Sequence, residues 1–150
     1  IFAIYPSFSI SFNIIMNIAI VGATGNVGRK ILEVLEKKEL SIDNLYLLAS
    51  SRSAGSKINF LGNEHEVLNL ETFDFSKAKI TFFAAGGKIS EKFAEKAAEH
   101  SLVIDNSSFY RMDPDVPLIV PQVNSDHLNN IKKNIIANPK LFYCTISNCA

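Results

Sequence analysis

The sequence has little cysteine, no surplus of charge of either sign, and no apolar run long enough to span a membrane. Lysine plus arginine and aspartate plus glutamate number 15 each, so the formal net charge at pH 7 is zero. Balanced charge argues against nucleic acid as a partner. Cys144 and Cys149 do not form the pattern of a disulfide framework or a metal site. We therefore expect no metal and a reduced, cytoplasmic chain.

Residues 1–15 carry no charge and have no periodic pattern that matches a sheet. The segment is too short to cross a membrane, contains Pro6, and lacks the basic start of a signal peptide. Because Met16 stands directly before the first expected strand, we interpret residues 1–15 as a non-native upstream extension. A membrane anchor is the alternative, but no membrane partner is expected.

Residues 17–30, NIAIVGATGNVGRK, have the order strand, glycine-rich turn, helix. Ile18 to Val21 form a short β-branched run typical of a buried parallel strand. Gly22, Gly25 and Gly28 follow, before an amphipathic helical pattern. Such glycines let the chain turn sharply, let a pyrophosphate approach the backbone, and let the helix pack on the strand. The helix N-terminus attracts phosphates, so this order predicts a dinucleotide site. The alternative is a strand-turn-helix that binds nothing.

The second apolar run, residues 45–49, is followed by Ser50, Ser51, Arg52 and Ser53. An NAD-dependent enzyme usually has a carboxylate here to bind the ribose hydroxyls, and none is present. A guanidinium among hydroxyls suits a 2′-phosphate, which indicates NADP. The alternative is a serine-rich surface turn with a solvated arginine.

The remaining pattern alternates strands with helices or long crossovers, which predicts a doubly wound, Rossmann-type α/β sheet, mostly parallel, with helices on both faces. The expected elements after the second strand are a hairpin at 57–70 around Gly62-Asn63, strands at 80–85, 102–105 and 134–137, and helices from Ser90 to about His100 and from Asn124 to about Ile131. Ser90 and Asn124 are expected to cap their helices. His65 is expected to be exposed and not a ligand.

Two further strand ends carry small or polar residues. Ala85, Gly86 and Gly87 would let the backbone lie against a nicotinamide ribose. Asn106 and Ser107 follow the strand at 102–105, at an edge where open α/β sheets place ligands. Arg111 can fix an anion, although an arginine between aspartates is often only a surface ion-pair partner.

Four motifs give a family resemblance: GATGNVG at 22–28, SSRSAG at 50–55, AAGGKISEKFA at 84–94 and DNSSFYRMDPDVPLIVPQVN at 105–124. With NIIANP at 134–139, they make residues 16–139 resemble the amino-terminal, NADP-binding domain of bacterial aspartate-semialdehyde dehydrogenase. This resemblance implies reductive dephosphorylation of aspartyl phosphate to aspartate semialdehyde with NADPH, in the biosynthesis of lysine and diaminopimelate, threonine and methionine. It also implies a homodimer or larger oligomer.

The resemblance also implies which of these residues bind the cofactor and which bind the substrate. Thr24 to Val27, Arg52 and Ser53 are implied to contact NADP, and Arg111 to hold the phosphate of the substrate or product. The full expected cofactor set is Gly22, Thr24, Gly25, Asn26, Val27, Gly28, Arg52, Ser53, Ala85, Gly86 and Gly87. The expected substrate set is Arg111, Asn106, Ser107 and Asn138.

The family motif continues NPNCST and supplies a cysteine thiolate that attacks the acyl phosphate. This chain has Lys140 and Leu141 after Asn138-Pro139, so Leu141 stands at the nucleophile position and Cys144 comes three residues too late. Deleting one adenine from a possible Lys140 codon restores Asn-Cys-Ser-Thr. Residues 140–150 are therefore interpreted as an out-of-frame tail, with no catalytic residue and without the family's carboxyl-terminal domain.

Two other readings remain open. N-acetyl-glutamyl-phosphate reductase shares the architecture and a cysteine nucleophile, although the RSAG and SSFYRMD stretches speak against it. A non-catalytic NADP-binding sensor is the other alternative. Short-chain dehydrogenases need a tyrosine with a lysine four residues later, and no tyrosine here has one. A sensor does not need that pair.

We expect residues 1–15 to add no folding energy. A chain that begins at Met16 should have the same thermal unfolding midpoint as the 150-residue chain, measured by circular dichroism. A markedly lower midpoint for the shorter chain would show that the extension packs on the domain.

Overall fold

The structure is a computed structural model that describes residues 16–38 and 40–139. The expectations about residues 1–15, Leu141, Cys144 and Cys149 concern positions outside these ranges.

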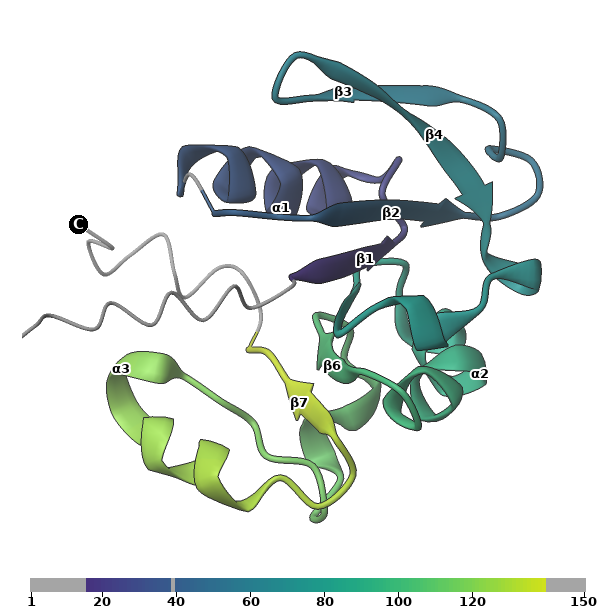
Figure 1. Cartoon of the computed structure of the whole chain (residues 1–150). Helices are drawn as coiled ribbons and strands as arrows, with labels where there is room; N and C mark the ends of the chain where they lie inside the picture. Colours follow the sequence, from purple (N-terminus) through teal and green to yellow (C-terminus); the bar gives the residue numbers. More distant parts are fainter. Residues whose placement is uncertain (1–15, 39, 140–150) are drawn as a thin grey trace, which may run out of the picture.

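The described chain forms a seven-stranded sheet in the order β3-β4-β2-β1-β5-β6-β7 (Figure 1). The strands are β1 (Asn17–Val21), β2 (Asn44–Ala49), β3 (Lys57–Phe60), β4 (Asn63–Asn69), β5 (Ile80–Phe83), β6 (Leu102–Asp105) and β7 (Ile135–Ala137). Every neighbouring pair is parallel except the β3–β4 hairpin. The chain builds outward from β1 in both directions, so the predicted doubly wound sheet is confirmed.

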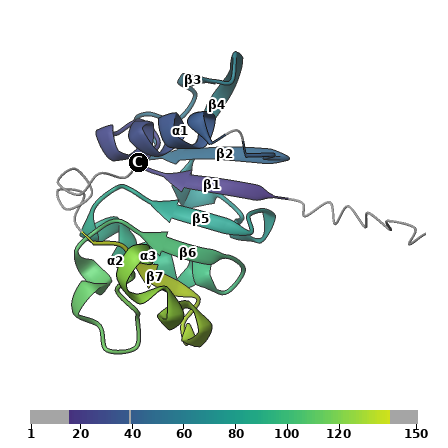
Figure 2. The ribbon, with the colours of Figure 1, turned by 90° about the vertical axis from the view of Figure 1, so that its left-hand side faces the viewer.

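Two helices cover opposite faces of this sheet. They are α1 (Asn26–Lys37) and α2 (Gly87–Ala98). Alternate residues of β1 explain the two layers, because Ile18 and Ile20 pack in one core cluster with Leu32 of α1. Ala19 and Val21 pack in the other cluster, which contains α2. Figure 2 shows β2, β1, β5 and β6 side by side in this order.

Shorter helices complete the described fold. They are the 3₁₀ helices η1 (Leu70–Thr72), η2 (Phe75–Lys77), η3 (Phe109–Met112) and η4 (Ser125–Asn130), and the single α-helical turn α3 (Pro121–Asn124). In the described part of the chain, no helix combines the length and the apolar character that crossing a membrane requires.

The turn between β1 and α1 depends on two glycines. Gly22 has φ +85°, a conformation that side chains with a Cβ rarely adopt. A Cβ on Gly28 would lie 2.3 Å from the carbonyl oxygen of Gly22 and 2.7 Å from Cα of Ala23. The first turn of α1 therefore lies directly against the end of β1, as the glycine spacing predicts.

Neither Ser90 nor Asn124 makes the predicted side-chain cap. α2 begins at Gly87 with Gly86 as its N-cap, and the Ser90 hydroxyl instead donates to the Asp105 carboxylate at 2.8 Å. Asn124 ends α3 and stands at the predicted N-cap position of η4, but its side chain makes no cap bond there. Its amide accepts from Val120 N at 2.7 Å and donates to the Leu118 carbonyl at 2.8 Å. Each of these side chains thus forms hydrogen bonds with other groups in place of the predicted bond to the helix N-terminus.

The predicted hairpin is confirmed, but its turn is Leu61-Gly62 and not Gly62-Asn63, because Asn63 already pairs with Phe60 as the first residue of β4. His65 is half-buried, not fully exposed as predicted, because its ring packs edge-on against Phe60 with centroids 6.0 Å apart. The last two residues predicted for β5 lie in the loop that follows it, since the strand ends at Phe83.

Gly28→Ala should lower the free energy of unfolding by roughly 1–3 kcal/mol, because the new methyl group would meet backbone atoms that cannot move aside. Gly87→Ala is the matched control, since its Cβ would lie 3.8 Å from Cβ of Phe109, an ordinary contact. Urea unfolding followed by circular dichroism measures both. Equal stability of the two variants would contradict the close packing of α1.

Candidate functional site

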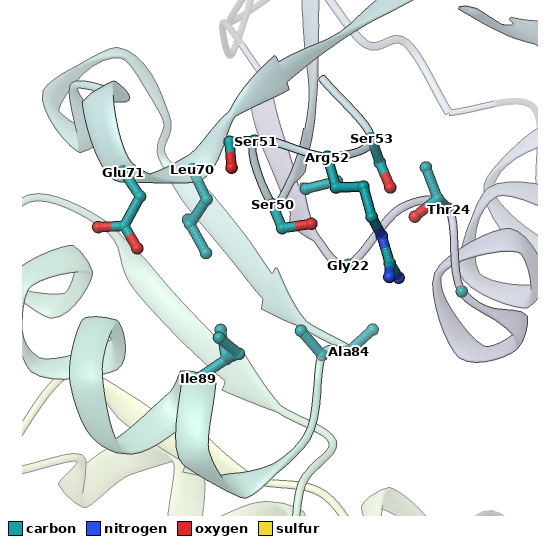
Figure 3. Close-up of a pocket in the computed structure, with 13 residues that line it drawn as sticks. Gly22, Thr24, Ser50, Ser51, Arg52, Ser53, Leu70, Glu71, Ala84 and Ile89 are labelled. Carbon is teal, nitrogen blue, oxygen red and sulfur yellow. The ribbon is translucent and has the colours of Figure 1, made fainter. Parts of the chain in front are cut away.

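A cavity of about 460 Å³ lies at the carboxyl ends of β1, β2 and β5 (Figure 3). It is lined by Gly22, Thr24, Gly25, Ala49, Ser50, Ser51, Arg52, Ser53, Leu70, Glu71, Ala84, Ala85 and Ile89. β1 pairs with β2 on one side and β5 on the other, so the cavity lies where the strand order reverses. This is the position at which open α/β sheets bind ligands.

The N-terminus of α1 faces this cavity through Thr24 and Gly25. Gly25 is the N-cap, no side chain caps the helix, and the first turn holds no acidic residue. The first N–H groups of a helix have no carbonyl partner within the helix. They therefore remain available to an anion, which the helix dipole also favours. A Cβ on Gly25 would make an ordinary contact with the Gly22 carbonyl at 3.4 Å, so the absence of a side chain leaves additional room beside the N-terminus of α1.

The Ser50–Ser53 turn forms the wall of the cavity beyond β2. Ser53 N and Ala54 N both donate to the Ser50 carbonyl, at 2.9 and 3.1 Å, which closes the turn. Figure 3 shows the Arg52 side chain extending from this turn toward Thr24. Among the residues that the structure describes, no ion pair engages Arg52. Its guanidinium is thus exposed and available to a phosphate.

Leu70 and Glu71 also line the cavity, and sequence reasoning missed them. They directly follow β4, which pairs in parallel with β2 and so ends at the same edge of the sheet. The hairpin pattern predicted β4 but not this pairing. Glu71 lies on the other side of Leu70 from Arg52 in Figure 3. Its carboxylate accepts from Lys92 Nζ at 2.9 and 3.0 Å, so its charge is already compensated.

Six of the eleven expected cofactor residues line this cavity: Gly22, Thr24, Gly25, Arg52, Ser53 and Ala85. Asn26, Gly28, Gly86 and Gly87 do not line it. Val27 lines a second, mostly apolar cavity of about 240 Å³, together with Asn106 and Asn138 from the expected substrate set. The fold therefore brings one cofactor candidate next to two substrate candidates.

Asn106, Arg111 and Asn138 are joined by hydrogen bonds at the carboxyl ends of β6 and β7. Arg111 donates from Nε to the Asn138 carbonyl and from Nη2 to the Asn106 carbonyl, both at 3.0 Å. The Asn138 amide donates to Oδ1 of Asn106 at 2.7 Å. The structure thus gathers three of the four expected substrate residues and brings Asn138 to Asn106 across 32 residues of sequence.

The fourth expected substrate residue, Ser107, faces inward and is buried. Its hydroxyl donates to Asp105 at 2.7 Å and accepts from Phe109 N at 3.1 Å. Both bonds are internal, so the side chain supports the loop. Within the described ranges, no three His, Cys, Asp or Glu side chains gather as a metal site would require.

The comparisons with known proteins agree with this geometry. The family model of the semialdehyde dehydrogenase NAD-binding domain matches residues 17–131. Aspartate-semialdehyde dehydrogenase 2 of Vibrio cholerae is 50% identical over 125 residues, which is 82% of this chain and 37% of the relative. The Aquifex aeolicus aspartate-semialdehyde dehydrogenase is 51% identical over 126 residues, 81% of this chain and 37% of the relative.

Solved structures give the same result. The crystal structure of Vibrio cholerae aspartate semialdehyde dehydrogenase II, complexed with ASA, superposes with a TM-score of 0.81 at 49% identity. The match covers 83% of this chain and 42% of that one. The Francisella tularensis enzyme has the same fold, with a TM-score of 0.63 at 20% identity.

The chain thus spans about 37% of the length of the curated relatives. Its match begins at the first strand and includes the glycine-rich turn, the Arg52 turn and most of the Arg111 loop. The family model describes a nicotinamide-cofactor domain, and the cavity at the carboxyl edge fits that class of ligand. The chain belongs to the semialdehyde dehydrogenase family, of which it carries the NAD-binding domain.

Proposed function

We propose that residues 16–139 are the NADP-binding domain of an aspartate-semialdehyde dehydrogenase. The main support for this proposal is that the cavity and the Asn106–Arg111–Asn138 cluster lie at the same edge of the sheet. A cofactor bound there would lie at the carboxyl ends of β1, β2 and β5, and an anionic substrate at those of β6 and β7. The reaction is reductive dephosphorylation of aspartyl phosphate, a step toward lysine, threonine and methionine.

We propose that the cofactor lies along the cavity from Arg52 toward α2. Residues 24–27 hold the pyrophosphate at the N-terminus of α1, where unpaired N–H groups favour negative charge. Arg52 and Ser53 bind the 2′-phosphate, and residues 85–87 lie against the nicotinamide ribose. The bound nicotinamide supplies the hydride, while Arg111 holds the phosphate of the substrate.

The nucleophile position distinguishes this chain from the enzymes it resembles. The strand β7 leads into Asn138-Pro139, and two residues later the chain has Leu141, which has no nucleophilic atom. We propose that a polypeptide of these 150 residues binds NADP without turning it over. The base, the substrate-carboxylate arginine and the dimer contacts would come from the part of the relatives that the match does not cover. Leu141 also favours a second candidate, a non-catalytic NADP-binding role.

Arg52→Ala should weaken NADP binding by roughly 1–3 kcal/mol, because it removes a charge-assisted contact to the 2′-phosphate. NAD lacks that phosphate and should lose far less affinity. Calorimetric titration with both cofactors measures the difference. Lys57→Ala is the control, since Lys57 pairs with Glu64 at 2.7 Å and does not line the cavity. Equal losses for NADP and NAD would remove the basis for the cofactor preference.

The purified 150-residue chain should show no phosphate-dependent reduction of NADP by aspartate semialdehyde. A displacement of about 1 Å from the reacting carbonyl can cost roughly 100-fold in rate, and Cys144 is three residues from the required position, up to about 10 Å along the chain. Leu141→Cys alone should also fail.

Restoring the reading frame after Pro139 and adding the downstream region should recover turnover in that assay. Turnover by the unaltered chain would contradict the inactive-fragment proposal and direct attention to Cys144. Cofactor binding that persists while the repaired enzyme stays inactive would favour the non-catalytic role.

A further inference from the structure

The last residue of β6, Asp105, is a fully buried carboxylate. It accepts three hydrogen bonds: from the Ser90 hydroxyl at 2.8 Å, from Ser107 N at 3.0 Å and from the Ser107 hydroxyl at 2.7 Å. None of the ion pairs in the described chain includes it. Burying a carboxylate without a cation is costly unless hydrogen bonds satisfy its oxygens. All three donors come from α2 or from the loop after β6, so the carboxylate ties these two segments together.

The Asp105 carboxylate also determines the shape of the loop that carries Arg111. The Ser107 hydroxyl, which donates to Asp105, accepts in turn from Phe109 N at 3.1 Å. Phe109 is the first residue of η3, and Arg111 is its third. On the other side, Asn138 N donates to the Asp105 carbonyl at 2.8 Å. One residue thus holds both the start of the Arg111 helix and the end of β7.

Arg111 uses only one edge of its guanidinium in these contacts. Nε and Nη2 lie along the side edge, and they donate to the carbonyls of Asn138 and Asn106. The end edge carries one N–H of Nη1 and the second N–H of Nη2, and neither donates to a residue within the described ranges. Two parallel donors of this kind match an oxyanion in a bidentate pair. The side edge therefore fixes the plane of the guanidinium, and no residue of the described chain occupies the end edge, whose geometry suits an anion.

We propose that Asp105 is a positioning residue for the anion site. Through Ser107 it places η3 so that Arg111 can pair its side edge with Asn106 and Asn138 and offer its end edge to a phosphate. This rests on the proposed function, because that function assigns the phosphate to Arg111. Asn106, Ser107 and Asn138 then act by orienting Arg111, and they need not contact the substrate themselves.

The test uses the 150-residue chain with ¹⁵N-labelled arginine and inorganic phosphate as the probe. The sequence has few arginines, so Arg111→Lys identifies the Arg111 Nε–H resonance by its loss. In the unaltered chain this proton should exchange slowly with solvent, because it is bonded to the Asn138 carbonyl. Added phosphate should shift the Arg111 resonances, and the titration gives an apparent dissociation constant.

Asp105→Asn should speed the exchange of this proton and raise the apparent dissociation constant for phosphate about tenfold, as expected for the loss of one well-oriented charged contact. Ser107→Ala should do the same, and Ser107→Thr, which keeps the hydroxyl, should restore both readouts. If Asp105→Asn does not fold, the two Ser107 variants decide the question.

Thr81→Val is the control for a general loss of stability. The Thr81 hydroxyl lies 2.8 Å from that of Ser101, and this buried pair is at the opposite end of β5 and β6. Breaking it should lower the unfolding midpoint and leave both Arg111 readouts unchanged. Equal losses in Thr81→Val, or unaltered readouts in Asp105→Asn and Ser107→Ala, would overturn the positioning role.

The two proposals fail in different ways. If the unaltered chain shows no phosphate-dependent shift, the assignment of phosphate to Arg111 fails, and the exchange rate of the Nε proton still decides whether Asp105 positions that side chain. If phosphate binds equally well to the unaltered chain and to Ser107→Ala, the assignment holds and the positioning role fails.

Discussion

The contact between the first turn of α1 and the end of β1 determines the geometry of the rest of the carboxyl edge. A Cβ at Gly28 would lie 2.3 Å from the Gly22 carbonyl, so only a glycine at this position lets the helix begin this close to the strand. This proximity directs the unpaired N–H groups of α1 into the cleft between β2 and β5. A helix that began farther away would leave this end of the cavity without backbone N–H donors, even if every strand kept its place.

A second, polar constraint acts at the other end of the same edge. Asp105 and Asn106 bring β5, β6 and β7 together, because the Asn106 amide donates to the Phe83 carbonyl at 3.1 Å and its oxygen accepts from Asn138. The Asp105 carboxylate also connects α2 to these strands, because it accepts a hydrogen bond from Ser90. Buried polar networks of this kind favour one arrangement over others, since each group left unpaired would carry a desolvation penalty. The apolar core fixes the sheet, and these bonds fix the loops beyond it.

The two predicted caps did not form because both side chains have other hydrogen-bond partners. Serine is a common N-cap residue, but the Ser90 hydroxyl donates to the buried Asp105 carboxylate of β6 instead. Asn124 likewise uses its amide within the loop before α3. Leu70 and Glu71 reach the cavity only because β4 pairs in parallel with β2, and nothing in a hairpin pattern states which outer strand joins the sheet. The local sequence pattern identified the strands and helices. The pairing of strands in the sheet decided which residues at the strand ends line the cavity.

The amino-acid sequence by itself determined the order of elements, the glycine-rich turn, the Arg52 turn and the family. These properties follow from local periodicity and from backbone freedom at single residues, which neighbours in the chain are enough to specify. Only the tertiary structure decided that Glu71 lines the cavity at the carboxyl ends of β1, β2 and β5 with its charge compensated, that Val27 lies beside Asn106 and Asn138, and that Ser107 faces inward. The reason is physical: a side chain's partner is whichever group the sheet brings within hydrogen-bonding distance, and that group can lie 32 residues away, as Asn138 does from Asn106.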